Sequence, residues 1–300
     1  MKIKTYSSEF EKSTVLVLGY FDCVHIGHKE LFSVAKTKAK ELKCQVSAMT
    51  FKNNPSVTLK RASRLINIYD ERLDIFKNLG VDVVLGIKFD ERFASKSAVK
   101  FLNDVLTKKI KAVICGYDFS FGKDMEGNVE LLRDFCQKKS IELVIIDKVD
   151  FEGEKLSTSL VKKHLSTGQI DKVTTCLGRN YFIQGVVVHG TGIGKQLGYP
   201  TANIKVNEDK YLPKNGVYGG IVIVNGSEYK SVINVGSRPT FGDDIKKIEA
   251  HLIGYNGDLY GKKVRAELHK YIRDIKKFDV QNELVIQISK DIKEALSGNQ

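Results

Sequence analysis

The sequence predicts two domains: an α/β domain built on a parallel sheet, then a small β-barrel with a C-terminal helix. In the first half of the chain, apolar strand-like runs alternate with helical patterns, which predicts parallel strands with helices on both faces of the sheet. After about Cys176 the helical patterns nearly vanish. The later runs are closely spaced and joined by turn dipeptides such as Asn225-Gly226 and Asn256-Gly257, which favours a barrel. We place the first domain at residues 1–175 and the second at residues 176–300.

In the first domain, strands and helices are expected to alternate. The strands are the apolar runs Thr14–Leu18, Gln45–Phe51, Val81–Ile87, Ala112–Cys115 and Glu142–Ile146. The helices are the amphipathic stretches Lys29–Leu42, Tyr69–Leu79, Ala98–Thr107, Val129–Lys138 and Ser159–Leu165. In such sheets ligands bind at the carboxyl ends of the strands, so the turns that follow strands are the first places to look for a site.

The second domain contains strand-like runs with little helix between them. These runs are Tyr181–His189, Val217–Val224, Tyr229–Val235, Ile248–Tyr255 and Lys263–Tyr271. A final amphipathic stretch, Gln281–Leu296, predicts a helix that packs on the outside of the barrel.

The composition is typical of a globular cytoplasmic protein. Of the 300 residues, 42% are hydrophobic and 28% are charged. The longest apolar runs have the length of strands and the N-terminus lacks the apolar core of a signal peptide, so we expect no membrane association. The five cysteines form no Cys-x-x-Cys pair, which is typical of reduced thiols in the cytoplasm.

The net charge of +12 raises the question of an anionic partner. The lysines are scattered over the predicted helices, which favours solvated helix faces over attraction of nucleotides. Binding of nucleic acid is the least favoured interpretation, because no aromatic-basic RNA motif accompanies the charge.

The turn after the first predicted strand carries the clearest chemical signal. It reads Leu18-Gly19-Tyr20-Phe21-Asp22-Cys23-Val24-His25-Ile26-Gly27-His28 and leads into the first predicted helix. A helix N-terminus attracts phosphate through its N–H groups and its dipole. His25 and His28 add hydrogen-bond donors, while Gly19 and Gly27 allow close approach of the backbone. The turn therefore predicts a site for a nucleoside triphosphate.

Two later segments fit the same site. One follows a predicted strand and places an acid and aromatic rings between glycines: Gly116-Tyr117-Asp118-Phe119-Ser120-Phe121-Gly122. The other brings three hydroxyls to the start of a helix, followed by a cation: Leu156-Ser157-Thr158-Ser159-Leu160-Val161-Lys162. Such hydroxyls suit either helix capping or phosphate binding.

Together these strings resemble the adenylyltransferase module of bacterial bifunctional riboflavin kinase/FAD synthetases, over about Val15 to Leu165. The resemblance implies a Rossmann-like nucleotidyltransferase fold that adenylylates FMN with ATP and releases pyrophosphate. It implies that ATP is bound by Gly19, Phe21, Asp22, His25, Gly27, His28, Ser157, Thr158, Ser159 and Lys162, with His25 and His28 acting on the phosphates. It assigns the flavin and adenine side to Gly116, Asp118, Phe119, Phe121 and Gly122.

Three positions depart from the family pattern. Cys23 stands where the family usually has Gly, Asn53-Asn54-Pro55 stands where a His-Pro pair is common, and Lys162 stands at a usual Arg position. Lysine keeps the charge but loses the two-pronged geometry of arginine. These departures leave open a site that only binds nucleotide.

A second constellation lies at the start of the barrel. A predicted strand runs into His189-Gly190-Thr191-Gly192-Ile193-Gly194-Lys195-Gln196-Leu197-Gly198-Tyr199-Pro200-Thr201-Ala202-Asn203. Glycines expose N–H groups that can cradle phosphates, although no Ser or Thr follows the Gly-Lys pair, so this is not a Walker A loop. Thr201 and Asn203 offer hard oxygen ligands that suit Mg²⁺.

This half resembles the riboflavin kinase module of the same enzymes across Leu177 to Leu296. The supporting strings are Leu177-Gly178-Arg179, Pro200–Asn203, Leu212–Tyr218, Asn234–Phe241 and Leu259–Lys262. The resemblance implies a six-stranded barrel that moves the γ-phosphoryl of MgATP to the ribityl 5′-hydroxyl. It implies that Glu249 is the catalytic base and that Arg273 lies near the flavin. ATP and Mg²⁺ are assigned to Gly190, Gly192, Gly194, Lys195, Thr201 and Asn203.

The whole chain is thus expected to convert riboflavin to FMN and FMN to FAD. Its partners are the small molecules ATP, riboflavin, FMN and FAD, Mg²⁺ enters with ATP, and no tightly bound organic cofactor is expected. Two alternatives stay open: an enzyme that retains only the kinase activity, and a flavin-responsive RNA-binding regulator. The oligomeric state is open as well.

Overall fold

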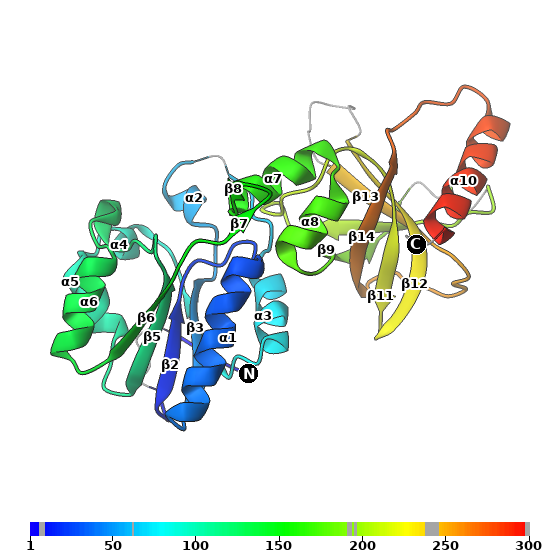
Figure 1. Ribbon diagram of the computed structural model, residues 1–300. Coiled ribbons are helices and arrows are strands. Elements are labelled where there is room, and N and C mark those ends of the chain that lie inside the picture. The colour runs from blue at the N-terminus through cyan, green and yellow to red at the C-terminus, as the bar shows by residue number, and fades with distance from the viewer. Residues whose placement is uncertain (6–9, 62, 191–193, 195–196, 238–245, 298–300) are drawn as a thin grey trace. The chain divides into compact units, whose positions relative to one another are not determined.

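The structure is a computed structural model that describes residues 1–5, 10–61, 63–190, 194, 197–237 and 246–297 (Figure 1). The chain forms two compact units, Met1–Thr158 and Ser159–Gln300. Within the described ranges, no helix is both long and apolar enough to cross a membrane.

The first unit is built on a parallel sheet, as the sequence predicts. Among the residues that the structure describes, the sheet has six strands in the order β1-β4-β3-β2-β5-β6. Their bounds are β1 Lys2–Lys4, β2 Thr14–Leu18, β3 Gln45–Phe51, β4 Val83–Ile87, β5 Ile110–Gly116 and β6 Glu142–Ile146. The short strand β1 was not predicted, because its three residues lie at the sheet edge and are mostly exposed.

Helices cover both faces of this sheet. Figure 1 shows α1 and α3 on one side of the strands and α5 and α6 on the other. The helices are α1 Ile26–Glu41, α2 Pro55–Thr58, α3 Tyr69–Asn78, α4 Glu91–Ala94, α5 Ala98–Val105 and α6 Val129–Lys138. A 3₁₀ turn, η1 Lys123–Met125, and a small hairpin of β7 Asp150–Phe151 and β8 Glu154–Lys155 complete the unit. The predicted α/β architecture is confirmed.

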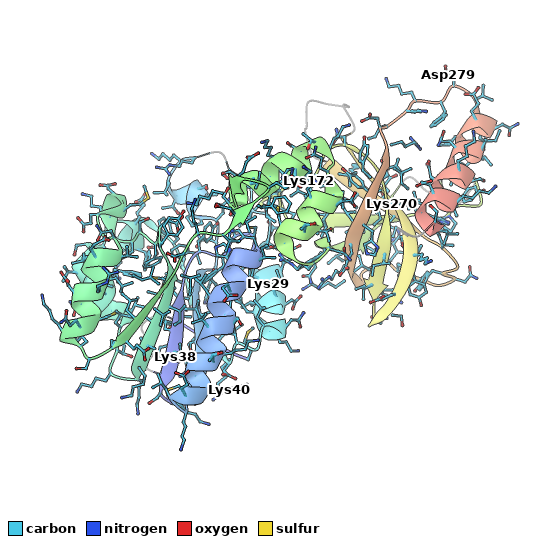
Figure 2. All side chains as sticks on the ribbon, in the orientation of Figure 1. Lys29, Lys38, Lys40, Lys172, Lys270 and Asp279 are labelled. Atoms are coloured by element: carbon cyan, nitrogen blue, oxygen red, sulfur yellow. The ribbon has the colours of Figure 1, made fainter. Side chains whose placement is uncertain are left out.

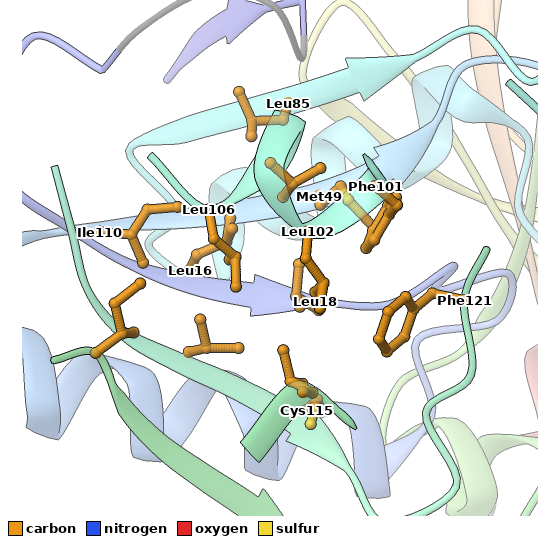
Figure 3. Packing of buried hydrophobic residues seen from close by; sticks show 14 of the residues in the cluster. Leu16, Leu18, Met49, Leu85, Phe101, Leu102, Leu106, Ile110, Cys115 and Phe121 are labelled. Carbon is orange, nitrogen blue, oxygen red and sulfur yellow. The ribbon is translucent and has the colours of Figure 1, made fainter. Parts of the chain in front are cut away.

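Strand β2 is the centre of this unit's core. Its five residues are all buried, which explains why it reads as an unbroken apolar run. Leu16 and Leu18 of β2 pack with Met49 of β3 and with Phe101 and Leu102 of α5 (Figure 3). The turn that leaves β2 therefore begins at a strand that is buried along its whole length.

The sheet has a topological switch point beside β2. The chain runs outward from β2 through β3 to β4, then returns to β5 on the other side of β2. In open α/β sheets the crevice that binds ligands lies at the carboxyl ends of such a strand pair. The two glycine-containing turns that the sequence singled out in this unit leave this edge, one after Leu18 and the other after Gly116.

The second unit is a barrel with flanking helices. In the described part of the chain, six antiparallel strands close in the order β10-β13-β12-β11-β14-β9. Their bounds are β9 Tyr181–Val188, β10 Ala202–Val206, β11 Gly216–Val224, β12 Ser227–Ser237, β13 Lys246–Leu252 and β14 Lys263–Arg273. The predicted six-stranded barrel is confirmed, but the run containing β10 was not recognised as a strand, because it is short and carries the polar residues Asn203 and Lys205.

Three helices accompany the described barrel: α7 Thr158–Thr167, which starts at the last residue of the first unit, α8 Ile170–Leu177 and α10 Gln281–Leu296. Helix α8 was not predicted, although it buries Ile170, Val173 and Leu177 at helical spacing. Helix α10 has the predicted bounds. It is fixed to β14 by Arg273, whose Nε and Nη2 donate to the two carboxylate oxygens of the buried Asp291 at 2.9 and 2.6 Å.

Charged side chains are distributed along the helices, as shown by the labelled Lys29, Lys38 and Lys40 of α1 in Figure 2. Lys38 is paired with both Glu41 and Glu142 at 2.8 Å. Such pairs are typical of a solvated helix face.

Candidate active sites

The histidine turn is held at the first turn of α1. His25 is the N-cap residue, and its Nδ1 accepts the backbone N–H of His28 at 3.2 Å. A neutral His25 that accepts through Nδ1 carries its proton on Nε2. The imidazole therefore caps the helix and keeps a donor for a ligand.

The two histidines lie against each other. Their rings are stacked, with centroids 3.7 Å apart and planes at 14°. The rings of Phe21 and His28 meet edge to face, with their centroids 5.2 Å apart. Both imidazoles are partly exposed, whereas Phe21 is 1% exposed, so Phe21 supports His28 from the core rather than facing a ligand with its ring.

Of the two predicted glycines of this turn, Gly19 is sterically required and Gly27 is closely packed. A Cβ on Gly19 would lie 2.5 Å from the Phe21 ring, and a Cβ on Gly27 would lie 3.2 Å from the His25 ring. Phe21 itself has a φ of 58°, in the left-handed region, which fits a turn held by its packing. The glycines thus make room for the rings that shape the turn.

Asp22 is placed to anchor the turn. It is 6% exposed, and its Oδ1 accepts the backbone N–H of Ile66 at 2.8 Å. Its backbone carbonyl also accepts the N–H of Asn67 at 3.0 Å. Asp22 therefore ties the histidine turn to the loop that precedes α3.

A buried arginine that the sequence did not single out adds a second anchor. Arg72 of α3 is fully buried and donates to the carbonyl oxygens of Tyr20 at 3.0 Å and Phe51 at 2.7 Å, and to Thr50 Oγ1 at 2.9 Å. Burial lowers the pKa of this guanidinium. Arg72 connects the carboxyl ends of β2 and β3, and an arginine in an amphipathic helix gives no sequence signal for such a role.

The second turn at the switch point divides into a surface part and a core part. Asp118 is exposed and pairs with Lys155 at 2.7 Å, and Phe119 is partly buried and stacks on Phe121 with centroids 5.4 Å apart. Phe121 is 6% exposed and belongs to the hydrophobic core. A Cβ on Gly122 would lie 2.7 Å from backbone atoms of Ala98. Phe119 and Asp118 are thus better placed for a ligand than Phe121 and Gly122, and Gly116 ends β5.

The hydroxyl-rich segment lies at the beginning of α7. Thr158 is the first helical residue, and its Oγ1 lies 3.4 Å from the buried Sγ of Cys23. Ser157 precedes the helix, and Ser159 is exposed in its first turn. Lys162 belongs to the second unit, where its Nζ lies 5.4 Å from the centre of the Tyr211 ring.

The barrel brings three polar residues into one row. Asn203 of β10 pairs with Glu249 of β13, and Glu249 pairs with Asn234 of β12. Their strand neighbours Ala202, Ile204, Ile233, Val235, Ile248 and Ala250 are all buried. Since successive side chains alternate across a strand, the row lies on the outer face of the barrel wall.

Asn234 is a functional candidate that the sequence did not single out. Its Oδ1 is buried and has no hydrogen-bond partner in the described structure. A buried acceptor of this kind is costly unless a ligand or water satisfies it. The signal in the sequence was the string that begins at Asn234, to which no role was given.

Two glycines of the glycine-rich loop, Gly190 and Gly194, lie against the Pro200–Asn203 motif. A Cβ on Gly190 would lie 2.0 Å from Nδ2 of Asn203, and a Cβ on Gly194 would lie 3.2 Å from Oγ1 of Thr201. His251 of β13 adds a tie, because its Nδ1 lies 2.8 Å from the carbonyl oxygen of Pro200, to which it can only donate. Thr201 is exposed. The loop, the motif and β13 thus form one local assembly.

Two predicted residues of this loop, Gly192 and Lys195, lie outside the described residues. Arg273 is described, and its guanidinium is engaged by Asp291 and by the carbonyl oxygen of Asp274. In this structure Arg273 therefore fixes α10 to the barrel.

Comparisons with known proteins match both halves of the chain. A family model described as FAD synthetase matches residues 7–160, and one described as riboflavin kinase matches residues 177–297. The bifunctional riboflavin kinase/FMN adenylyltransferase of Bacillus subtilis is 34% identical over 295 residues, which cover 96% of this chain and 93% of that protein. The protein of the same description from Escherichia coli K12 is 32% identical over 295 residues, which cover 96% and 94%.

A solved structure described as a macrolide-efflux protein from Streptococcus pneumoniae is also similar. It is 30% identical, covers 100% of this chain and 99% of that chain, and has a TM-score of 0.89. The similarity shows that the two chains share a fold over their whole length.

Matches to both family models and to bifunctional relatives favour neither the single-activity enzyme nor the RNA-binding regulator. The chain belongs to the bacterial bifunctional riboflavin kinase/FMN adenylyltransferase family, whose two enzyme activities it carries on two domains.

Proposed function

We propose that the two reactions take place at separate sites, one in each unit. The barrel phosphorylates riboflavin to FMN with ATP, and the α/β unit adenylylates FMN to FAD and releases pyrophosphate. The observation that carries the kinase site is the direct cross-strand pairing of Asn203 with Glu249. The observation that carries the other site is the pair of stacked histidines at the N-terminus of α1.

In the kinase reaction, Glu249 takes the proton of the ribityl 5′-hydroxyl as its oxygen attacks the γ-phosphorus of ATP. ADP leaves, so the O–P bond formed to riboflavin replaces the one broken in ATP. General-base assistance of this kind is worth roughly 10²–10⁴ in rate. Asn234, with its unpartnered buried Oδ1 beside Glu249, is positioned to accept a hydrogen bond from the same substrate.

The donor set beside Glu249 fits Mg²⁺. Thr201 and Asn203 offer a hydroxyl and an amide oxygen, which are hard ligands, and phosphate oxygens and water can complete an octahedral shell. Gly190 and Gly194 keep the space next to these two side chains free of other side chains. Bound there with ATP, Mg²⁺ would neutralise charge on the transferred phosphoryl group.

In the adenylyl transfer, a phosphate oxygen of FMN attacks the α-phosphorus of ATP. No protein nucleophile is needed, because the acceptor is already a phosphate. His25 and His28 donate to the phosphate oxygens at the positive end of α1, which stabilises charge in the transition state. Phe119, which is only partly buried in the turn after β5, is the aromatic ring proposed to contact a flavin or adenine.

The domain boundary proposed at residues 175/176 lies between the matched ranges 7–160 and 177–297, but it falls within α8, whereas the compact units divide at residues 158/159. All five cysteines are free thiols, which supports a location in the reducing cytoplasm.

The experiment that tests the proposal is a chromatographic product assay with purified protein and MgATP. Riboflavin and FMN are supplied in parallel tubes, and the products are separated over time. We expect FMN and then FAD from riboflavin, and FAD from FMN. If Glu249→Gln and His28→Ala each abolished both activities in folded protein, two separate sites would be ruled out.

A further inference from the structure

We propose that Cys23, His25 and His28 form a binding site for a transition-metal ion of the zinc type, distinct from the Mg²⁺ that enters with ATP. Each residue offers one ligand atom, and these atoms all lie within 4.8 Å of one another. Cys23 is buried, and the two histidines are partly exposed, so an ion can reach the site from the side of the imidazoles.

The chemistry of the donors selects the ion. Thiolate and imidazole are preferred by Zn²⁺ and its neighbours in the transition series, whereas Mg²⁺ prefers oxygen. One thiolate and two imidazoles supply three of the four ligands of tetrahedral zinc. The fourth position is then open to water or to a phosphate oxygen.

Binding requires small rearrangements of side chains. The stacked rings have nearly parallel planes, so their lone pairs do not converge and one ring must turn about its Cβ–Cγ bond. If His25 binds through Nδ1, it exchanges its hydrogen bond from the His28 N–H for the metal. Cys23 likewise exchanges its 3.4 Å contact with Thr158 Oγ1. The partial positive charge at the N-terminus of α1 disfavours a bound cation. The same charge favours the Cys23 thiolate, whose negative charge offsets one of the two positive charges of the metal ion.

The site has a consequence for the enzyme, which rests on the phosphate-binding role proposed for the two histidines. A metal ion that takes up His25 and His28 excludes the ATP phosphates from them. Zinc would therefore inhibit FAD formation in competition with ATP and leave FMN formation unchanged, because the barrel does not use these residues.

The binding test uses the metal-free full-length protein and Zn²⁺ in competition with a chromophoric chelator. Co²⁺ serves as a second probe, because a thiolate ligand gives a sulfur-to-cobalt charge-transfer band. We expect one site whose affinity falls at least about 100-fold in Cys23→Ser and Cys23→Ala, since a direct ligand matters at least as much as an outer-shell partner. Cys44→Ser is the matched control, because Cys44 lies in the same unit and its Sγ donates to the carbonyl oxygen of Leu42.

Three results would overturn the site. The first is a zinc affinity and a cobalt spectrum that are unchanged in both Cys23 variants, and the second is the absence of binding by the wild-type protein. Retention of binding by His28→Gln at full strength would do the same, and it does not depend on how the Cys23 variants fold.

The activity test measures both products in one tube at excess Mg²⁺ with buffered free Zn²⁺. Loss of ATP to zinc would lower both rates, so the kinase of the same chain is the internal control. In the wild-type protein, we expect added Zn²⁺ to lower the rate of FAD formation and to leave the rate of FMN formation unchanged. In each Cys23 variant, we expect the rate of FAD formation with Zn²⁺ to equal the rate of the same variant without Zn²⁺. Zinc binding with no loss of FAD formation would contradict the phosphate role of the histidines and leave the metal site intact.

Discussion

Asn203 and Glu249 lie directly opposite each other on the antiparallel strands β10 and β13. Side chains in such pairs have their Cβ atoms about 4.5–5.5 Å apart, so the proposed Mg²⁺ ligand and the proposed general base can act on neighbouring atoms of one phosphoryl transfer. Val188 lies opposite Asn203 on its other side, and Gly190 follows two residues later. The pairing of β9 with β10 therefore places the start of the glycine-rich loop beside Asn203.

Glu249→Gln tests the base. The substitution keeps the size of the side chain and its place on β13, but a neutral amide cannot take the proton of the ribityl hydroxyl. We expect FMN formation to fall by roughly 10²–10⁴, with FAD formation from added FMN unchanged. Glu228→Gln, an exposed glutamate on β12, is the control. A kinase rate near the wild-type value would remove Glu249 as the base.

His28→Ala tests the adenylyl-transfer site. Loss of one positioned donor to a developing charge typically costs about 10²–10³ in rate. We expect a decrease of that size in FAD formation from FMN, with FMN formation from riboflavin retained. Lys40→Ala, on the exposed face of the same helix, is the control. An equal decrease in both products by folded protein would contradict the assignment.

Arg72→Met tests the buried anchor of the histidine turn. The carbonyls of Tyr20 and Phe51 would lose a charged donor inside the protein, so we expect the first unit to lose at least about 2–3 kcal/mol of stability. Thermal unfolding followed by calorimetry would show this loss as a transition of the first unit at a lower temperature. Arg133→Met, an exposed arginine of α6, should leave that transition in place. An unshifted transition in Arg72→Met would show that the network carries no net stability.

Asp291→Asn tests the attachment of α10. The variant removes the charge from the buried pair with Arg273, and we expect a loss of about 1.5–3 kcal/mol in the second unit. The measurement is denaturant unfolding of the barrel, compared with Glu283→Gln, an exposed residue of the same helix. If FMN formation fell without loss of stability, Arg273 would instead act on the flavin, as the family resemblance implies.

We expect the stability of the barrel to depend on pH through the side chain of Glu267. Burial raises the pKa of Glu267, but the hydrogen bond with His269, the Arg265 charge and the hydrogen bond from Asn180 outweigh it and lower the pKa below its ordinary value of 4.5. A group with a lowered folded-state pKa stabilises the fold above its unfolded value and loses that contribution as pH falls through the folded one. The stability difference between wild type and Glu267→Gln should thus be largest near neutral pH and shrink below 4.5. A difference that stayed constant with pH would contradict this origin.

The sequence predicted most elements of the first unit because each is a local pattern. β2, β3, β6 and α6 have the bounds that their apolar periodicity gave. It missed β10 because Ala202–Val206 is only five residues long and overlaps the Pro200–Asn203 motif, and α8 because a domain boundary was placed within it. Phe121 was predicted beside a ligand, yet its ring lies in the core, since glycine-flanked aromatics look the same in either setting.

By itself, the sequence determined the order of the elements, the two-domain architecture and the motifs that mark the family, because periodicity, turn residues and short strings are properties of neighbouring positions. Only the tertiary structure decided that Asn203, Glu249 and Asn234 form one row and that Arg72 anchors the histidine turn. Strand register and side-chain burial depend on contacts between segments far apart in the chain, and no local pattern encodes them.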